Sequence, residues 1–283
     1  MENVTRTVYS SYIQTNLFLD LASQYFENST LNEKLGVQSR ILPTADQKSR
    51  LAAYVIGNRG HNFVVGANGI PKPERVQHRA SDAALYGQVP FVLRPLNNDL
   101  SQADRAKYCL RLEQDISGTR YAAYYGRRLD KSNTVAQMQV KNVVNGVETT
   151  APFVPNSSNL NPTPPDLSST GTNTTDGSYL LTVATLALTI SEAEAQELLN
   201  VAKVMYGDES YAIISEIGLV TGVDKSVPVN SQAGNFQMNE LLVAQIAAHS
   251  PALIPLAFNP TGATVTLNVG STEPLLNLTT VGG

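Results

Sequence analysis

The chain has 283 residues, of which 16% are charged, and a net charge of −4 at pH 7. This acidic balance argues against nucleic acid as a partner, because phosphate backbones are bound by basic faces. A single cysteine excludes a disulfide framework within the chain. The sequence contains no run of eighteen apolar residues, so no membrane-spanning helix is expected. The opening MENVTRTVYSSYIQ lacks the pattern of a signal peptide, so folding in a cytoplasm is expected. Few charges and many Asn, Ser, Thr, Gln and Gly are typical of subunits that pack against copies of themselves.

Apolar residues at four-residue intervals predict a helix near the N-terminus, with Ser10 or Ser11 as its cap. The stripe consists of Ile13, Leu17, Leu21 and Tyr25. Two interpretations stay open: the helix packs on its own domain, or it is an arm that docks on a neighbouring subunit.

The first predicted strand covers 51–57, and a Gly/Pro-rich tract over 58–79 follows it. The glycine spacing fits neither nucleotide-binding signature, so a structural loop with positive-φ glycines is favoured. Residues 89–96 predict an edge strand, because Pro90 and Pro95 cannot donate to a neighbour. Further strands are expected at 108–112, after Gly118 and at 136–141. Asn145-Gly146 indicates a type I′ hairpin turn.

Residues 155–178 offer almost nothing to bury and predict a polar linker or excursion. After it we expect a strand at 179–190 and a helix from the Ser191–Glu194 capping box to Gly207. The pattern further predicts a strand at 211–220 covered on both faces, a second helix around 238–249, and an alternating strand at 263–269. The tail from Thr272 has no clear partner strand, as expected of a segment that docks on another subunit.

These elements predict an α+β fold, mainly antiparallel β-sheet, with an N-terminal helix and two helices in the C-terminal half. The expected domains are an N-terminal helix and arm at 1–50, a β-rich domain at 51–154, the linker at 155–178, and an α+β domain with its tail at 179–283.

A search for chemistry gives no catalytic constellation, so we expect no enzyme activity, no cofactor and no metal. The histidines His61, His78 and His249 lack metal-ligand spacing, and His249 is placed at a helix end, where the dipole favours it. Cys109 is expected to be a buried, inert thiol. Glu216 lies inside an apolar strand, where an arginine partner or a solvent-facing edge is favoured over acid–base catalysis.

Basic and aromatic residues interleave over 105–131. Single-stranded nucleic acid could stack there, or the side chains could be solvated, but Arg and Tyr favour a protein interface. The predicted interface residues are Ile13, Leu17, Leu21, Tyr25, Arg111, Arg120, Tyr121, Tyr124, Tyr125, Arg127 and Arg128.

Two stretches resemble virion proteins of tailed bacteriophages. Between Leu51 and Asp130 the segments VIGNRGHN, PKP and ISGTRYAAYYGRRLD follow in the order of baseplate-wedge-type proteins, with Gly118, Tyr121 and Tyr124 matching a Gly-x-x-Tyr-x-x-Tyr strand. ISEIGLV at 214–220, with NELLVAQIAAH at 239–249, is similar to a segment of tail-collar and tail-fibre attachment proteins. Together they cover less than half of the chain, and the tryptophans of the wedge-type pattern are missing.

The resemblance implies a virion structural subunit, made in the host cytoplasm, that contributes to a tail, neck or baseplate through ring-like contacts. Its expected partners are copies of itself and other virion proteins. One alternative is a host-surface or glycan-binding module, with Tyr121, Tyr124 and Tyr125 as an aromatic platform. A second is a hydrolase that uses Cys109 or a histidine.

Overall fold

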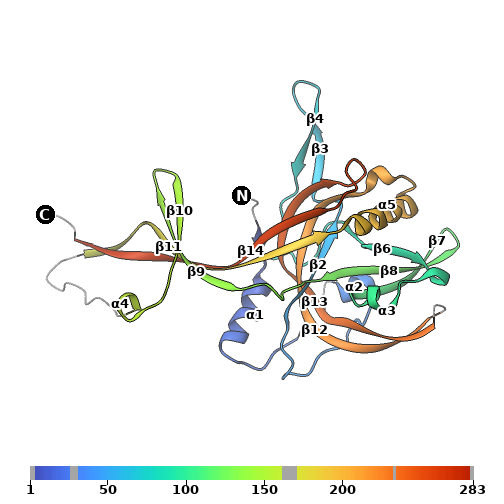
Figure 1. The fold of residues 1–283 in the computed structure, drawn as a ribbon, viewed down its shortest axis with the longest axis horizontal. Helices are drawn as coiled ribbons and strands as arrows, with labels where there is room; N and C mark the ends of the chain where they lie inside the picture. The colour runs from blue at the N-terminus through green and yellow to red at the C-terminus, as the bar shows by residue number, and fades with distance from the viewer. Residues whose placement is uncertain (1–3, 26–30, 161–170, 232–233, 281–283) are drawn as a thin grey trace. The chain divides into compact units, whose positions relative to one another are not determined.

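The computed structural model describes residues 4–25, 31–160, 171–231 and 234–280. The chain divides into two compact units (Figure 1). Unit 1 combines 1–129 with 189–263, and unit 2 combines 130–188 with 264–283. Each unit therefore draws on two separate stretches of the chain, whereas the sequence led us to expect domains that follow one another.

An eight-stranded antiparallel sheet forms the centre of unit 1 (Figure 1). Its order is β1-β13-β12-β2-β8-β6, with β5 beside β2 and β7 beside β8. β12 is buried continuously from Ile214 to Val223, which confirms the expected coverage of this strand on both faces. The strands are β1 (Thr5–Arg6), β2 (Arg50–Gly57), β5 (Gln88–Val89), β6 (Val92–Pro95), β7 (Tyr108–Ile116), β8 (Thr119–Arg128), β12 (Ile213–Ser231) and β13 (Gly234–Pro255).

The helix α5 (Glu192–Tyr206) packs its apolar side on this sheet. The Ser191 side chain accepts from the Glu194 N–H and the Glu194 side chain accepts from the Ser191 N–H, so the predicted capping box is present. The helix ends at Gly207, which has a φ of 80°. The buried side chains of α5 are Ala195, Leu198, Val201 and Ala202. The shorter helical elements of unit 1 are α1 (Val8–Phe18), α2 (Asn32–Leu35), α3 (Gln102–Arg105), η1 (Leu96–Asn98) and η2 (Glu209–Tyr211).

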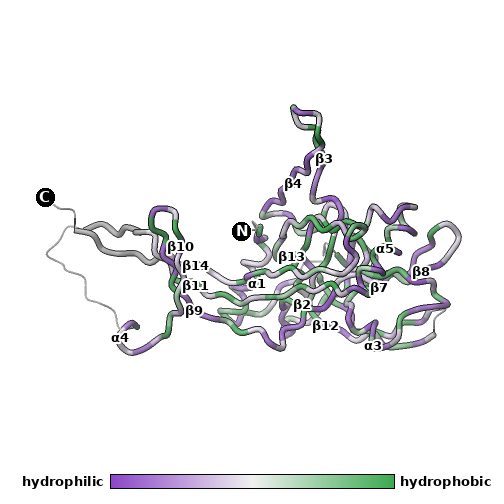
Figure 2. Tube along the Cα trace, turned by 45° about the horizontal axis from the view of Figure 1, so that its top comes forward, coloured by the Kyte–Doolittle hydropathy of each residue, from purple (hydrophilic) through white to green (hydrophobic). Residues whose placement is uncertain are grey.

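A separate two-stranded hairpin, β3 (His61–Val65) and β4 (Pro71–Arg75), projects from the body of unit 1 (Figures 1 and 2). The expectation of an irregular loop over 58–79 is therefore wrong. Phe63 pairs with Pro73 and Val65 with Pro71. Because opposite residues of an antiparallel pair share a face, one side of the hairpin is apolar.

Unit 2 is built on a four-stranded antiparallel sheet of order β10-β9-β11-β14. Asn145 and Gly146 have φ values of 51° and 78°, and Val144 pairs with Val147, as the predicted type I′ turn requires. The elements are β9 (Ala136–Val144), β10 (Val147–Pro152), α4 (Ser157–Leu160), β11 (Gly171–Ile190) and β14 (Ala263–Thr280).

The fold class is confirmed, but the second predicted helix of the C-terminal half is wrong. Residues 238–249 lie in β13, which pairs with β12 along its length. β13 is buried from Glu240 to Ala247. A strand covered on both faces needs a continuous apolar run, and such a run is also compatible with a helix.

The N-terminal helix is shifted toward the start of the chain. Thr7, and neither Ser10 nor Ser11, provides the cap, and α1 ends at Phe18. Among the residues of α1, Ile13 is buried, while Leu17 is 40% exposed. The predicted stripe is therefore not the buried face of a helix, and half of it lies beyond the helix.

Two expectations about extended segments also change. The tail has a partner in its own chain, because β14 runs to Thr280 beside β11. Within the predicted linker 155–178, α4 covers 157–160 and β11 begins at Gly171. The part of the linker at 161–170 lies outside the described residues.

Candidate functional site

A buried carboxylate on β12 is the centre of a polar cluster in unit 1. Glu216 is 1% exposed. Its Oε2 is 2.9 Å from His78 Nε2 and accepts the Tyr86 N–H at 3.1 Å, while its Oε1 accepts the Gly87 N–H at 2.8 Å. All three donors belong to residues 76–87, which we call the strap. Within the described parts of the chain, Glu216 has no arginine partner, and it does not face solvent, so neither expectation for this residue holds.

The hydrogen bonds to this carboxylate outweigh the cost of burying it. Burial alone raises the pKa of Glu216, but hydrogen bonds from His78, Gly87 and Tyr86 lower it, and the net pKa lies below the ordinary 4.5. The carboxylate is therefore ionised at neutral pH and serves as the acceptor that holds the strap on the sheet.

Two histidines stack face to face beside Glu216. The ring centroids of His78 and His249 are 3.8 Å apart with an interplanar angle of 9°, and Tyr86 stacks on His78 at 4.3 Å. Because two rings cannot occupy the same face, His78 lies between Tyr86 and His249. His249 Nε2 is 3.0 Å from the Asp82 carbonyl oxygen. His249 lies in β13, so its expected place at a helix end is wrong.

Glycines let the backbone approach this cluster closely. A Cβ on Gly57 would lie 2.4 Å from Glu216 Oε1, and one on Gly60 would lie 2.4 Å from the Ser215 carbonyl oxygen. Neither glycine has a positive φ, whereas Gly69 at the hairpin turn has a φ of 76°. The glycine tract is therefore explained mainly by close approach to β12, and positive φ applies only at Gly69.

A cavity of about 200 Å³ opens beside the cluster. Its lining includes Arg75, His78, Glu216 and His249. Among the described residues, no group of three or more His, Cys, Asp or Glu side chains is arranged to hold a metal ion.

Part of the Arg/Tyr tract, the basic and aromatic residues of 105–131, turns inward. Arg111 is 6% exposed and forms ion pairs with Asp99 at 3.0 Å and Glu113 at 2.8 Å. Its Nε donates to the Tyr124 hydroxyl at 3.2 Å. Tyr124 and Tyr125 are buried in the same sheet. These three predicted interface residues contact their own chain and are removed from the surface, because β7 at 108–111 and β8 at 122–126 are buried on both faces.

The remaining members of the tract are more accessible. Arg127 pairs with Glu194 at 2.7 Å and Arg128 with Asp224 at 2.6 Å, both within unit 1. Arg120 is exposed and pairs with Glu113 at 2.9 Å, and Tyr121 is half-buried. These four residues keep part of their surface but already have partners in this chain or contacts with its core.

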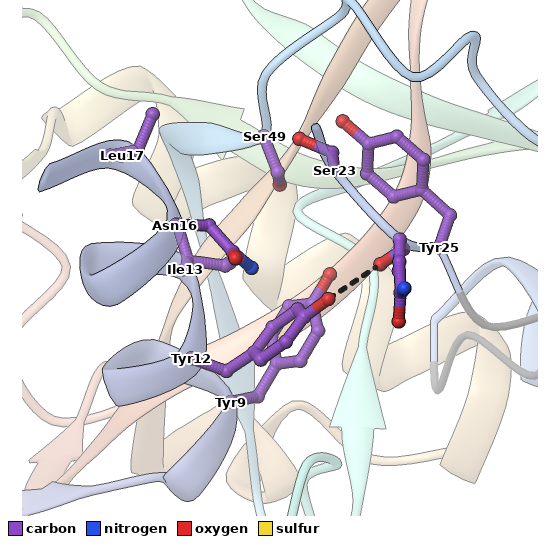
Figure 3. Close-up of a pocket in the computed structure, with 9 residues that line it drawn as sticks. Tyr9, Tyr12, Ile13, Asn16, Leu17, Ser23, Tyr25 and Ser49 are labelled. Carbon is purple, nitrogen blue, oxygen red and sulfur yellow. Dashed lines mark hydrogen bonds between the residues drawn. The ribbon is translucent and has the colours of Figure 1, made fainter. Parts of the chain in front are cut away.

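The N-terminal part of the predicted interface surrounds a small pocket (Figure 3). Ile13, Leu17 and Tyr25 line it together with the stacked rings of Tyr9 and Tyr12. Its volume of about 10 Å³ has room for one water molecule at most. Leu21 is not part of this lining and is 47% exposed.

Large apolar side chains remain exposed on several segments of the described chain. Phe18 at the end of α1 is 89% exposed, and Phe63 on the β3–β4 hairpin is 63% exposed. In unit 2, the paired Val144 and Val147 are 62% and 64% exposed. Exposed apolar residues that gather on projecting elements indicate surfaces that are buried by a partner.

Cys109 is confirmed as a buried thiol. It is fully buried in β7, and burial raises its pKa to about 12, so the thiolate form is scarce at neutral pH. None of the helices that the structure describes is long and apolar enough to cross a membrane.

A model of a family of unknown function, DUF7208, matches residues 1–282. The chain belongs to this family. No curated protein and no solved structure matches the chain.

Sequence reasoning missed the polar cluster around Glu216 in this DUF7208 member. His78, Glu216 and His249 are far apart in the chain, and sheet pairing together with the strap brings them together. The one signal was Glu216 itself, a carboxylate inside an apolar strand, which had to have a buried partner.

Proposed function

We propose that the chain is a structural subunit of a tailed-bacteriophage virion, which forms part of the tail, neck or baseplate through ring-like contacts with copies of itself and other virion proteins. The bacteriophage assignment rests on the resemblance of residues 51–130, and of 214–220 with 239–249, to such proteins. The subunit role rests on the surface of unit 2.

One observation carries the subunit role: the sheet of unit 2 has apolar side chains but little core. Neither β9 nor β10, both of which are fully described, contains a buried residue. Met138 and Val144 extend from one face of β9, and Val147 from the same face of β10. Since a sheet is stable when one face is covered, this face is suited to be covered by another subunit.

The polar cluster supports a structural role over a catalytic one. Both oxygens of Glu216 accept hydrogen bonds from the strap, so the carboxylate already has the partners that a general base would need to exchange for substrate. The thiol of Cys109 is fully buried and its pKa is raised, which is unfavourable for a nucleophile.

The glycan-binding alternative loses its proposed platform. Two of its three tyrosines, Tyr124 and Tyr125, are buried in the sheet of unit 1 and cannot stack on a sugar. Tyr121 alone keeps partial exposure.

The test is the size of the purified chain and its presence in particles. Native mass spectrometry is expected to give a defined oligomer, and purified virions are expected to contain the chain in a fixed copy number. A persistent monomer that is missing from virions would contradict the proposal.

A paired substitution locates the contact. Val144→Thr with Val147→Thr keeps β-branched side chains in the strands but replaces exposed methyl groups by hydroxyls, so the oligomer is expected to weaken without unfolding of the monomer. Gln137→Thr is the control, because Gln137 is exposed and lies on the opposite face of β9. Equal oligomerisation of both variants would exclude this face as the contact.

A further inference from the structure

We propose that the strap is an acid-labile clasp in unit 1, with His249 as the group whose protonation releases it. The inference does not depend on the proposed virion role, because it concerns contacts within one chain. It rests on the arrangement of four side chains, His78, Asp82, Glu216 and His249, and on the backbone groups that they hold.

Two side chains of the sheet make most of the side-chain hydrogen bonds to the strap, and Leu85 of the strap is buried in the core. Glu216 on β12 accepts from His78, Tyr86 and Gly87. His249 on β13 contacts the Asp82 carbonyl oxygen and stacks on His78. Backbone bonds close the two ends of the strap, from Val76 N–H to the Gly60 oxygen and from Asn58 N–H to the Gly87 oxygen. The polar contacts between the middle of the strap and the sheet therefore depend on the state of these two side chains.

The hydrogen-bond partners fix one ring nitrogen of each histidine that carries a proton. A carbonyl oxygen only accepts, so His249 Nε2 must carry the proton, and His78 Nε2 likewise donates to the Glu216 carboxylate. The Nδ1 atoms of both rings are buried and have no hydrogen-bond partner among the described residues. A proton added to His249 Nδ1 would create a buried donor without an acceptor, on a ring whose centroid is 3.8 Å from that of His78.

The surrounding charges oppose one another at His249. Glu216 and Asp82 favour protonation of His249, and His78 disfavours it. Arg75 lines the adjoining cavity, and Tyr86 covers the far face of His78. Burial is the largest influence and lowers the pKa of His249, and the net pKa lies below the ordinary 6.5. The clasped state therefore binds this proton less well than a released state does, and falling pH favours release below about pH 6.5.

Glu216 acts in the same direction at lower pH. Its pKa in the fold is below 4.5, so its contribution to the clasped state is complete above pH 4.5 and is lost as the pH falls further. Protonation of His249, between pH 6.5 and 5, thus precedes the loss of the Glu216 contribution.

Release has a defined consequence for the N-terminal segment. The Val8 N–H at the start of α1 donates to the Ala80 oxygen on the strap, at 2.8 Å. The neighbouring Thr7 N–H donates to the Ala247 oxygen on β13, at 2.9 Å. Opening the strap frees Val8 and leaves Thr7 in place, so these adjacent amides report on the strap and on the sheet separately.

The experiment is amide hydrogen exchange of the full chain at pH 7.5 and 5.0, with rates corrected for intrinsic exchange. If His249 stays neutral while clasped and has a pKa of 6.5 when released, the released population rises up to about 30-fold over this range. We expect protection of residues 78–87 and of the Val8 amide to fall between about 5-fold and about 30-fold. Protection of Thr7 and of α5 should change by less than about 2-fold.

Two variants and one titration complete the test. His249→Gln keeps a side-chain donor but cannot be protonated, so it should abolish the difference between the two pH values. His61→Gln, a substitution of the histidine outside this cluster, should retain the difference in strap protection between the two pH values. An NMR titration of the wild-type histidines should find one resonance, lost in His249→Gln, with a pKa below 6.5. If His249→Gln does not fold, this titration and the wild-type exchange decide: equal strap protection at both pH values, or a His249 pKa at or above 6.5, overturns the proposal.

Discussion

Substitution of Glu216 by glutamine should destabilise unit 1 more than its small chemical change suggests. The carboxylate accepts from three donors on the strap and is 1% exposed, so solvent cannot replace a lost contact. An amide has one acceptor oxygen, and its NH₂ group must then face either the Gly87 N–H or the Tyr86 N–H. One orphaned backbone donor costs about 1–3 kcal/mol, and loss of the charge-assisted bond to His78 adds about 1 kcal/mol. We therefore expect Glu216→Gln to lower the free energy of unfolding by about 2–4 kcal/mol at pH 7.

The effect should depend on pH in a stated direction. Because the pKa of Glu216 is lowered in the fold, ionisation stabilises the wild type above pH 4.5, and this advantage disappears as the pH falls through the folded value. Urea unfolding followed by circular dichroism, at pH 7.0 and 3.5, measures the loss of unfolding free energy at each pH. Glu209→Gln, at an exposed carboxylate, is the control and should stay within about 0.5 kcal/mol of wild type. A loss below about 0.5 kcal/mol at pH 7, or a loss that grows on acidification, would refute this reasoning.

Two further substitutions test local features of unit 1. Ser191→Ala removes the side chain that accepts from the Glu194 N–H, and thermal unfolding should show a loss of about 1 kcal/mol. Gly126→Ala places a Cβ 2.5 Å from Cys109 Sγ at a φ of 66°, so it should cost more than about 1 kcal/mol. Adding Cys109→Ala to Gly126→Ala should recover part of that loss in a double-mutant cycle, and strictly additive effects would show that the thiol is not the obstacle.

Local sequence signals predicted the elements that depend on local chemistry. The Ser191–Glu194 box and Gly207 define α5, and Asn145-Gly146 defines its hairpin, because each is satisfied by bonds or dihedral angles within a few residues. The alternation of apolar and polar residues at 263–269 likewise predicted a strand, and in β14 Leu267 is buried while its neighbours Thr266 and Asn268 are exposed.

Elements that depend on distant partners could not be predicted in this way. Residues 238–249 have helix-compatible spacing, but β12 and β1 pair with them and both faces become buried. Register shifts between β12 and β13, and a φ of 46° at Val243, interrupt the two-residue period that would have indicated a strand. Tertiary pairing thus overrides the local pattern.

The interface residues illustrate the same limit. Arg111 and Tyr124 have the composition of a contact surface, yet Asp99 binds both of them inside unit 1. Composition cannot distinguish an arginine that binds a partner chain from one that binds a carboxylate twelve residues away in its own chain. The cluster at Glu216 was hidden for a related reason, since its members meet only after the strap crosses β12 and β13.

The pairing of β2 with β12 has a consequence for how the chain acquires its structure. Gly57 lies opposite Glu216 and Tyr54 opposite Leu219, so the middle of the unit 1 sheet joins residues that are more than 150 positions apart. The whole of 130–188 must be looped out before this contact can form, and contacts of such sequence separation slow folding to milliseconds or longer. On the ribosome, β2 emerges long before β12, and its edge lacks that neighbour until most of the chain has been synthesised. The interval in which this chain is vulnerable to aggregation is therefore set by translation time as much as by its stability.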